Sequence, residues 1–355
     1  MRQLNYIKAA TLEWHDVPSP ELSSPEAALV RPLVVSTCDM DGVVISGLAR
    51  LKGPVAVGHE GVAVVLDVGE SVGSVRPGDR VIVPWKISCG KCEKCRLGFT
   101  AHCRAVPREA AYSWGPTARE YGGFLSDEVL VPFADHMLVP LPPELDPGLA
   151  SGLSDNIVDA WRAVGPPLAR RPGGSVAIAG GGGPGSIGLM ACGLAGASGA
   201  GEVLYMDWSA DRRAVAERWG ALTIDTSDSL PERLAHRDFD VTVDASGNPA
   251  ALALVARHTG DNGICTSTAG AIYALGDVPM PVFHLYRRSA EFHTGWVHTR
   301  ALIDEPLRLL REGRFDPAPV VTRTLPFSEA ADALVEPFTK LIFERDPEPA
   351  ERAAG

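Results

Sequence analysis

Four cysteines in one short stretch have the spacing of a metal site. They are Cys89, Cys92, Cys95 and Cys103, in the pattern C-x2-C-x2-C-x7-C. A tetrahedral zinc ion takes four thiolates at ~2.3 Å, and short C-x2-C steps let backbone turns direct the sulfurs to one point. The alternatives are disulfides and an iron–sulfur cluster, but a ferredoxin run brings its fourth cysteine closer and follows it with proline. The spacing therefore predicts a structural zinc.

Four thiolates around a zinc ion leave two surplus negative charges. We expect nearby basic side chains to offset them, namely Lys86, Lys91, Lys94 and Arg96. The remaining cysteines include Cys192 and Cys265, which lie in apolar segments and are expected to be inert core residues.

Composition bounds the function classes. The chain has 355 residues, of which 45% are hydrophobic, and a net charge of −11. The length allows two domains, and the acidic balance argues against nucleic-acid binding, which needs a basic surface. No run approaches the ~20 apolar residues of a membrane span, and we expect no signal peptide. Seven cysteines, four of them in one cluster, suit a reducing cytoplasm.

The pattern along the chain changes near residue 150. Before it, short apolar runs separated by turn residues predict an all-β domain; examples are Ala28–Val35, Gly61–Asp67 and Asp79–Pro84. From residues 151 to 290, strands alternate with helices, which predicts a doubly wound parallel sheet. We expect residues 291–355 to hold one more helix, Leu302–Glu312, and to return to the first domain, with a frayed end from Asp346.

A glycine-rich run lies between a predicted strand, Ser175–Ala179, and a predicted helix, Ser186–Ala197. In that context the run predicts a dinucleotide-binding loop, because glycines let the backbone approach the pyrophosphate at a helix N-terminus. Two registers fit, Gly180/Gly182/Gly185 and Gly183/Gly185/Gly188, and we favour the second because Ile187-Gly188-Leu189 opens the helix. Ser186 and Ile187 are then expected to bind the cofactor together with the glycines of this register.

An acidic residue follows the next predicted strand at about the expected offset of ~20 residues. It is Asp207, and we expect its carboxylate to bind the ribose hydroxyls of NAD and to repel the 2′-phosphate of NADP. Arg212, five residues on, could reach the adenosine ribose or a phosphate. NAD is thus the expected cofactor over NADP.

Two further metal-ligand types stand apart from the cluster, Cys38 and His59. With them, nearly the whole chain resembles the zinc-containing medium-chain dehydrogenase/reductase superfamily, of the alcohol dehydrogenase type. The motifs that carry the resemblance are Cys38-x-x-Asp41, Gly58-His-Glu60, Gly78-Asp-Arg-Val81, the four-cysteine stretch and Val243-Asp-Ala-Ser-Gly-Asn248.

The resemblance implies a fold, a cofactor pair and a ligand set. The expected fold is a GroES-like β-rich catalytic domain (1–150, with a zinc lobe at about 86–104), a Rossmann NAD-binding domain (151–290) and a return segment (291–355). Two zinc ions are implied, one structural and one catalytic, the latter held by Cys38, His59 and a third ligand that aligns with Asp155. Glu60 is an alternative or transient ligand. Members form oligomers, so a homodimer or homotetramer is expected.

The sequence departs from the family where a proton relay is expected. Met40 replaces the usual Ser or Thr two residues after the zinc cysteine, and Val43 replaces a histidine; neither side chain carries a proton. Two carboxylates, Asp39 and Asp159, fall near the expected site. Either Asp159 or Glu60 transfers the proton, or water does so while Met40 only lines a pocket, or the reaction needs no such relay.

These departures leave three functional hypotheses. The first is hydride transfer between NAD(H) and an alcohol or carbonyl compound. The second is a biosynthetic reductase or cyclase of the same fold acting on C=N, C=C or hemiacetal groups, and the third is a non-catalytic cofactor-binding protein. Candidate pocket-lining residues are Trp85, Trp114, Trp161 and Phe283, and structural roles are favoured for His293 and His298.

Overall fold

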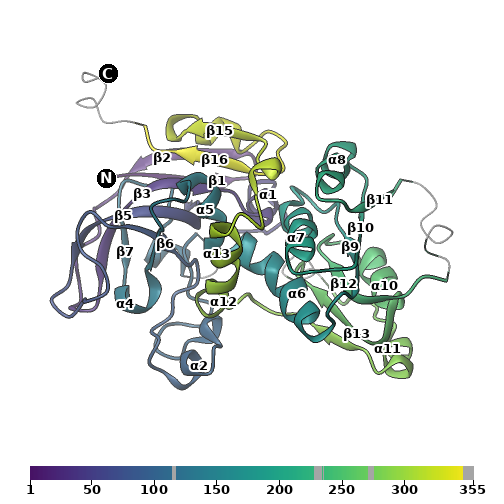
Figure 1. The fold of residues 1–355 in the computed structure, drawn as a ribbon. Coiled ribbons are helices and arrows are strands. Elements are labelled where there is room, and N and C mark those ends of the chain that lie inside the picture. The colour runs from purple at the N-terminus through teal and green to yellow at the C-terminus, as the bar shows by residue number, and fades with distance from the viewer. Residues whose placement is uncertain (114–116, 228–233, 235, 271–275, 347–355) are drawn as a thin grey trace. The chain divides into compact units, whose positions relative to one another are not determined.

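The computed structural model describes residues 1–113, 117–227, 234, 236–270 and 276–346. The candidate pocket residue Trp114 and most of the expected frayed end lie outside these residues. The chain forms two compact units (Figure 1). Of these described residues, the first unit contains those in 1–155, 298–307 and 321–346, and the second contains those in 156–297 and 308–320.

The first unit is built on a seven-stranded sheet. Its order is β15 (Arg323–Pro326), β16 (Leu341–Glu344), β3 (Ala28–Ser36), β5 (Glu60–Val68), β6 (Arg80–Val83) and β8 (Val139–Pro140), with β7 (Val129–Val131) paired to β3. A smaller sheet has the order β2 (Thr11–Asp16), β1 (Arg2–Lys8) and β4 (Val55–Ala56). The strands that the sequence predicts in this half are present.

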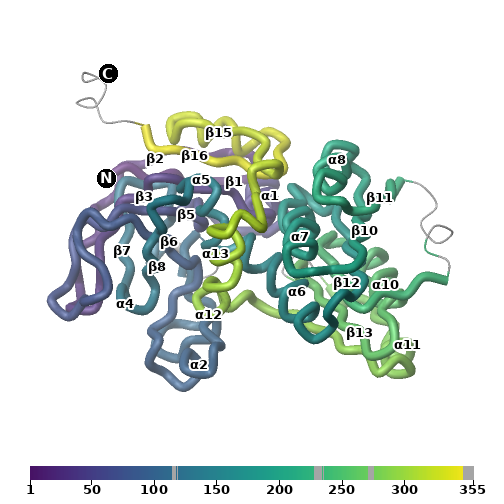
Figure 2. Tube along the Cα trace, in the orientation of Figure 1, coloured from purple at the N-terminus to yellow at the C-terminus, as the bar shows by residue number. Residues whose placement is uncertain are grey.

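Valine-rich strands form the core of this sheet because their side chains alternate between its two faces. Val30, Val35, Ala63 and Val65 of β3 and β5 belong to one buried cluster with Phe124. The C-terminal strand β16 pairs antiparallel with β3, with Ile342 opposite Ser36. The last part of the described chain therefore lies against one of its first strands (Figure 2).

Short helices connect these strands. They are α1 (Asp39–Ile45), α2 (Glu93–Arg96), α3 (Ala118–Tyr121), α4 (Ala134–Met137), α5 (Pro147–Ser151), α12 (Thr299–Leu302) and α14 (Ala330–Ala333), with 3₁₀ turns η1 (Thr100–His102), η2 (Gly152–Ser154) and η5 (Phe327–Glu329). Helix α13 (Asp304–Arg311) runs from the first unit into the second, where η4 (Ala318–Val320) follows.

The second unit holds a six-stranded parallel sheet. Its order is β11 (Leu222–Asp225), β10 (Glu202–Asp207), β9 (Ser175–Ala179), β12 (Phe239–Asp244), β13 (Thr259–Ser267) and β14 (Glu291–His293). Counted from the first strand, this is the order 3-2-1-4-5-6 of the Rossmann fold. Its helices include α6 (Asn156–Arg170), α7 (Ser186–Ala197), α8 (Ala210–Arg218), α10 (Pro249–Arg257) and α11 (Val282–Arg288). The predicted fold class is confirmed.

The compact units differ in detail from the predicted domain bounds. The first division falls after Asp155 rather than after residue 150. Residues 291–297 belong to the second unit because β14 completes its sheet, and residues 308–320 do so as well. The return to the first unit is therefore made in two pieces. Among the described residues, no helix has the length and apolar character needed to cross a membrane.

One glycine of the cysteine-rich lobe yields a stability prediction. Gly90 has φ +72°, and a Cβ there would stand 2.7 Å from the ring of His136. Gly90→Ala should lower the free energy of unfolding by about 2 kcal/mol or more, since the left-handed conformation alone costs ~1–2 kcal/mol. Thermal or denaturant unfolding measures the effect.

The matched control is Gly78→Ala. Gly78 has φ +94°, but a Cβ there meets no atom within 4 Å. It should show only the cost of backbone strain. Equal destabilisation by the two variants would contradict a steric role for His136.

Candidate metal centres and nucleotide-binding loop

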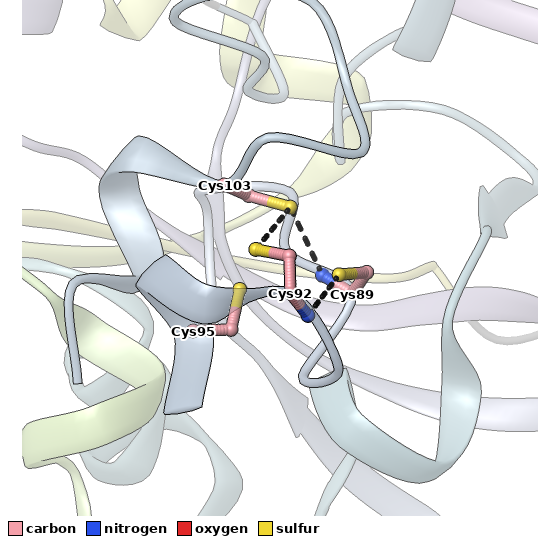
Figure 3. Close-up of side chains that lie close together, drawn as sticks. All are labelled: Cys89, Cys92, Cys95 and Cys103. Atoms are coloured by element: carbon pink, nitrogen blue, oxygen red, sulfur yellow. Dashed lines mark hydrogen bonds between the residues drawn. The ribbon is translucent and has the colours of Figure 1, made fainter. Parts of the chain in front are cut away.

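The four cysteines of the lobe converge on one point (Figure 3). Their sulfur atoms all lie within 4.8 Å of one another, and all seven cysteines of the chain are free thiols. A zinc tetrahedron with ~2.3 Å bonds has sulfur–sulfur edges of about 3.8 Å, and the Cys92 and Cys103 sulfurs are 4.0 Å apart. The cluster therefore fits a closed metal site.

Peptide N–H groups donate hydrogen bonds to these sulfurs. The amides of Cys89 and Ala105 donate to Cys103 Sγ, each at 3.4 Å, and the amide of Cys92 donates to Cys89 Sγ at 3.3 Å. The expected cations have other recorded partners: Lys91 pairs with Glu26, Lys94 lies over Phe99, Arg96 donates to the Lys91 carbonyl, and Lys86 lies over Trp85. Backbone dipoles can therefore stabilise the thiolates in addition to any effect of these cations.

A second group of ligand types gathers in the first unit, from three distant segments. Cys38, His59 and Asp155 are all buried, and their ligand atoms lie within 4.8 Å of one another. The Cys38 thiol is 3.3 Å from Asp155 Oδ2, and His59 Nε2 is 3.5 Å from the same oxygen. The structure thus brings together the three residues that the sequence analysis selected.

Strand pairing places the first two residues of this group. β3 ends at Ser36, which pairs with Glu60 at the start of β5. Cys38 comes two residues after this pair, and His59 comes one residue before it. Cys38 is also the N-cap of α1. These ends of two neighbouring strands hold the thiol and the imidazole side by side.

The residue before Asp155, Ser154, positions this third member of the group. The Ser154 hydroxyl accepts from the Gly61 amide and donates to the Gly61 carbonyl, both at 3.0 Å. The Trp85 amide donates to the Ser154 carbonyl at 3.2 Å. Asp155, the next residue, is thereby fixed beside His59 although it lies 117 positions from Cys38.

Asp41 supports both N-terminal ligands. Its Oδ2 accepts from the Cys38 amide at 2.7 Å, and its Oδ1 is 3.7 Å from His59 Nδ1. Nδ1 is buried and has no hydrogen-bond partner among the described residues. An imidazole whose Nδ1 faces a carboxylate presents Nε2 for a metal.

Negative charge is concentrated around the buried thiol. Burial and the charges of Asp155, Glu60 and nearby aspartates raise the pKa of Cys38 well above its usual value. Burial lowers the pKa of His59, but the charges of Asp41 and Asp155 outweigh it and raise the pKa to about 9. A thiol, an imidazole and a carboxylate in such a field suit a divalent cation, and zinc takes this mixture of sulfur, nitrogen and oxygen ligands.

The candidate proton-transfer residues have different surroundings. Met40 is half-buried on α1, and the buried Glu60 is ion-paired with Lys340 at 2.6 Å. Asp159, on α6 in the second unit, is hydrogen-bonded to Arg162, which also donates to the Gly295 carbonyl at 2.9 Å. The Asp159 carboxylate is therefore engaged by a neighbouring guanidinium on the same helix.

The glycine-rich loop has close approaches at particular positions. A Cβ at Gly182 would lie 1.9 Å from the Ser246 carbonyl oxygen, and one at Gly180 would lie 2.5 Å from the Tyr205 hydroxyl. Gly185 has φ +74° and caps α7, whereas a Cβ at Gly183 meets no atom within 4 Å. The close approaches at Gly180 and Gly182 support the Gly180/Gly182/Gly185 register, whereas the φ of +52° at Gly183 and a neighbour 3.1 Å from a Cβ at Gly188 support the register that we preferred.

Asp207, at the end of β10, is completely buried. It accepts hydrogen bonds from Tyr205 Oη at 2.6 Å, the Ser209 amide at 2.7 Å, and Arg212 Nε and Nη2 at 2.8 and 2.9 Å. Arg212 Nη1 also donates to the Pro184 carbonyl at 3.1 Å. Arg212 thus ties the acid to the glycine-rich loop, an arrangement that a five-residue spacing alone does not reveal.

The other candidates fall into different environments. The Trp85 ring is buried and lies 5.5 Å from the His59 ring, while Phe283 is largely exposed. Trp161 folds over Gly165 within α6. His298 Nδ1 accepts from the Ala101 amide at 3.2 Å, so it anchors the cysteine-rich lobe, and His293 pairs with Glu291.

Sequence reasoning missed Lys340 and Ser154. Lys340 is a lone basic residue ahead of a short apolar strand, and Ser154 is one of many serines. Nothing in their local pattern distinguishes them. A possible signal for Ser154 was its position directly before the expected ligand Asp155.

Two family descriptions match the chain. "Alcohol dehydrogenase GroES-like domain" matches residues 24–143, and "Zinc-binding dehydrogenase" matches residues 186–311. Together they span most of both units.

Known proteins match over nearly the whole length. The "Probable zinc-binding alcohol dehydrogenase" of Mycobacterium tuberculosis is 28% identical over 337 residues, covering 93% of this chain and 84% of the relative. An S-(hydroxymethyl)glutathione dehydrogenase of Escherichia coli is 28% identical, covering 86% and 88%. The crystal structure of alcohol dehydrogenase TADH from Thermus sp. ATN1 superposes with a TM-score of 0.86 at 28% identity, covering 98% of this chain and all of that one.

The loop geometry predicts the effect of adding one methyl group. Gly182→Ala should weaken dinucleotide binding by at least about tenfold, because the new Cβ displaces the loop from the Ser246 carbonyl. Gly183→Ala, where space is open but φ is +52°, is the control for backbone strain and should weaken binding less than Gly182→Ala. Calorimetric titration with NAD⁺ compares them, and equal affinity of all three proteins would refute the steric argument.

Proposed function

Since this chain belongs to the zinc-containing medium-chain dehydrogenase/reductase superfamily, we propose that it is a zinc-dependent oxidoreductase that transfers a hydride between NAD(H) and an alcohol or carbonyl compound. The observation that carries this proposal is the buried set of Cys38, His59 and Asp155. These three residues would hold a catalytic zinc, and the four cysteines of the lobe would hold a structural one. A bound zinc supplies Lewis-acid stabilisation of negative charge on a substrate oxygen.

The chain's own residues prepare that site. Asp41 orients the imidazole of His59 and the backbone of Cys38. Three protein ligands leave one position of a tetrahedral shell for substrate or water. Thiolate, neutral imidazole and carboxylate together balance the charge of a divalent ion, which keeps the shell neutral.

The cofactor proposal rests on the second unit. The loop at Gly180–Gly188 precedes α7, whose N-terminal amides can receive a pyrophosphate. We keep NAD over NADP, supported by the acid Asp207 after β10. Asp207 accepts four hydrogen bonds from the chain itself, and Arg212, which donates two of them, is buried as well.

A second candidate function has an observation in its favour. Met40 offers no hydroxyl, and Asp159 is held by Arg162. A reduction of a C=N or C=C bond needs no relay from an alcohol hydroxyl, so a biosynthetic reductase fits these residues as well. We place it second because the relatives that span most of the chain are named as alcohol or hydroxymethyl dehydrogenases.

Assembly and compartment are part of the proposal. The helix α11 exposes Val282, Phe283 and Tyr286, and β14 is the last strand in the order of its sheet. Exposed apolar side chains and an open sheet edge each favour association with a second copy, so we propose a homodimer or homotetramer, which light scattering would test. Seven free thiols fit a reducing compartment such as the cytoplasm.

Metal content and activity test the main proposal together. Purified protein should contain about two zinc ions per chain and form NADH from members of a primary and secondary alcohol panel. Cys38→Ser should lose one zinc and this activity, whereas it should keep its fold by circular dichroism. A parent protein with two zinc ions and no activity on any alcohol or aldehyde would favour the second candidate function.

Met40 tests the proton route. Met40→Ser restores a hydroxyl two residues after Cys38, and we expect kcat for alcohol oxidation to rise about tenfold or more at neutral pH, a typical gain from one positioned proton-transfer group. Met40→Ala is the control for pocket volume. If both variants leave alcohol oxidation undetectable across the panel, the alcohol dehydrogenase assignment is wrong.

A further inference from the structure

Tyr205, on β10, is a completely buried tyrosine to which the proposed function gives no role. Its neighbours on this strand, Leu204 and Met206, are apolar and equally buried, so packing alone does not require a hydroxyl here. The Tyr205 hydroxyl donates a hydrogen bond to Asp207 Oδ2 at 2.6 Å. Burial and the charge of Asp207 raise the pKa of Tyr205 well above its usual value, so the hydroxyl keeps its proton and acts as a donor.

The Asp207 carboxylate joins Tyr205 to Arg212. Its Oδ2 accepts from Arg212 Nε at 2.8 Å as well as from Tyr205, and its Oδ1 accepts from Arg212 Nη2 at 2.9 Å. The amide of Ser209 completes the set at 2.7 Å. A carboxylate accepts about four hydrogen bonds, so these contacts inside the protein use the capacity of Asp207. Its side chain cannot turn without breaking one of them.

This network reaches both ends of the glycine-rich loop. Arg212 Nη1 donates to the Pro184 carbonyl at 3.1 Å, and a Cβ at Gly185 would lie 3.1 Å from Arg212 Nε. At the other end of the loop, a Cβ at Gly180 would lie 2.5 Å from the Tyr205 hydroxyl. Tyr205 and Arg212, which Asp207 connects, therefore lie against the beginning and the end of the loop.

A loop of this composition needs support from outside itself, because glycine has more backbone freedom than any other residue. Gly181, Gly183 and Gly185 all have positive φ, at +93°, +52° and +74°. Ordering such a loop when a ligand binds costs free energy and weakens binding, whereas a loop that is already held in place avoids this cost. Side chains that restrain the loop can therefore raise affinity without touching the ligand.

We propose that Tyr205 is a positioning residue which, through Asp207 and Arg212, holds the glycine-rich loop in one conformation before a dinucleotide binds. This inference rests on the proposed function, since it requires a dinucleotide at the loop. Tyr205 has no exposed surface with which to contact a ligand. It acts on binding through the carboxylate that it orients and through the guanidinium that this carboxylate holds.

Tyr205→Phe tests the proposal, because it removes the hydroxyl and keeps the ring. The matched control is Tyr112→Phe. Tyr112 is also completely buried, and its hydroxyl donates to the Leu130 carbonyl at 3.0 Å in the first unit. Calorimetric titration measures the affinity for NAD⁺ and for ADP, which carries the adenosine and the pyrophosphate without the nicotinamide. Hydrogen exchange of the loop amides is measured in the cofactor-free protein.

Tyr205→Phe should bind both NAD⁺ and ADP about tenfold more weakly than the parent, since hydrogen bonds to charged groups are the strong ones. Its loop amides should exchange faster than those of the parent when no cofactor is present. Tyr112→Phe should match the parent in both measurements. Parent-like affinity or parent-like loop exchange in Tyr205→Phe would overturn the proposal.

A double variant tests the path through Asp207. Adding Tyr205→Phe to Asp207→Asn should weaken NAD⁺ binding little further, because residues that act through one network are not additive. A further tenfold loss would show that Tyr205 acts by another route and would overturn the proposal. If Tyr205→Phe does not fold, Arg212→Lys takes its place, and unchanged loop exchange in that variant would equally overturn it.

Failure of this inference is distinguishable from failure of the proposed function. If the parent protein binds neither NAD⁺ nor ADP, the dinucleotide part of the proposed function is wrong, and the inference is wrong with it. If the parent binds both and Tyr205→Phe behaves like Tyr112→Phe, the positioning role alone is wrong.

Discussion

Much of the first unit depends on one electrostatic constraint, the burial of several acidic groups in a small volume. Cys38, Asp41, Glu60 and Asp155 are all buried within mutual electrostatic reach. Isolated buried charges cost several kcal/mol each unless they are paired. Lys340 forms an ion pair with one of these groups, Glu60. The Cys38 thiol and the Asp155 carboxylate are arranged as metal ligands, so a bound divalent cation would offset their charges. The buried charges that are costly for folding therefore also define the proposed reaction centre.

The two metal centres are built on opposite principles. The four cysteines of the lobe lie within fifteen positions and are oriented by local turns and peptide N–H groups, so their site is largely independent of the sheet. The three-residue site needs the ends of β3 and β5 and the turn η2, which the Ser154 hydroxyl fastens to Gly61. A zinc ion in the lobe therefore says nothing about which reaction the protein catalyses. The site of Cys38, His59 and Asp155, in contrast, can form only in the folded unit.

This contrast explains what the sequence predicts. Strand and helix alternation after residue 150 indicates a doubly wound parallel sheet. Ligand types in family motifs select Cys38, His59 and Asp155 before their proximity is known. The hydrogen-bond network around Asp207 could not be predicted from the sequence, because the bonds from Tyr205 and Arg212 depend on where these side chains lie. Lys340 lies 280 positions from Glu60, and no local pattern connects two such residues. The pairing of Lys91 with Glu26 was equally out of reach, because closeness in sequence does not determine where a long side chain points.

The central claim is that a second metal lies at the scattered site. Anomalous X-ray diffraction at the zinc edge tests it most directly, because it locates zinc without assuming any activity. The account predicts two anomalous peaks in each chain, one among the four sulfurs of the lobe and one between Cys38 Sγ, His59 Nε2 and the Asp155 carboxylate. A peak at the lobe with none at the second position, in crystals grown with zinc in excess, would contradict it.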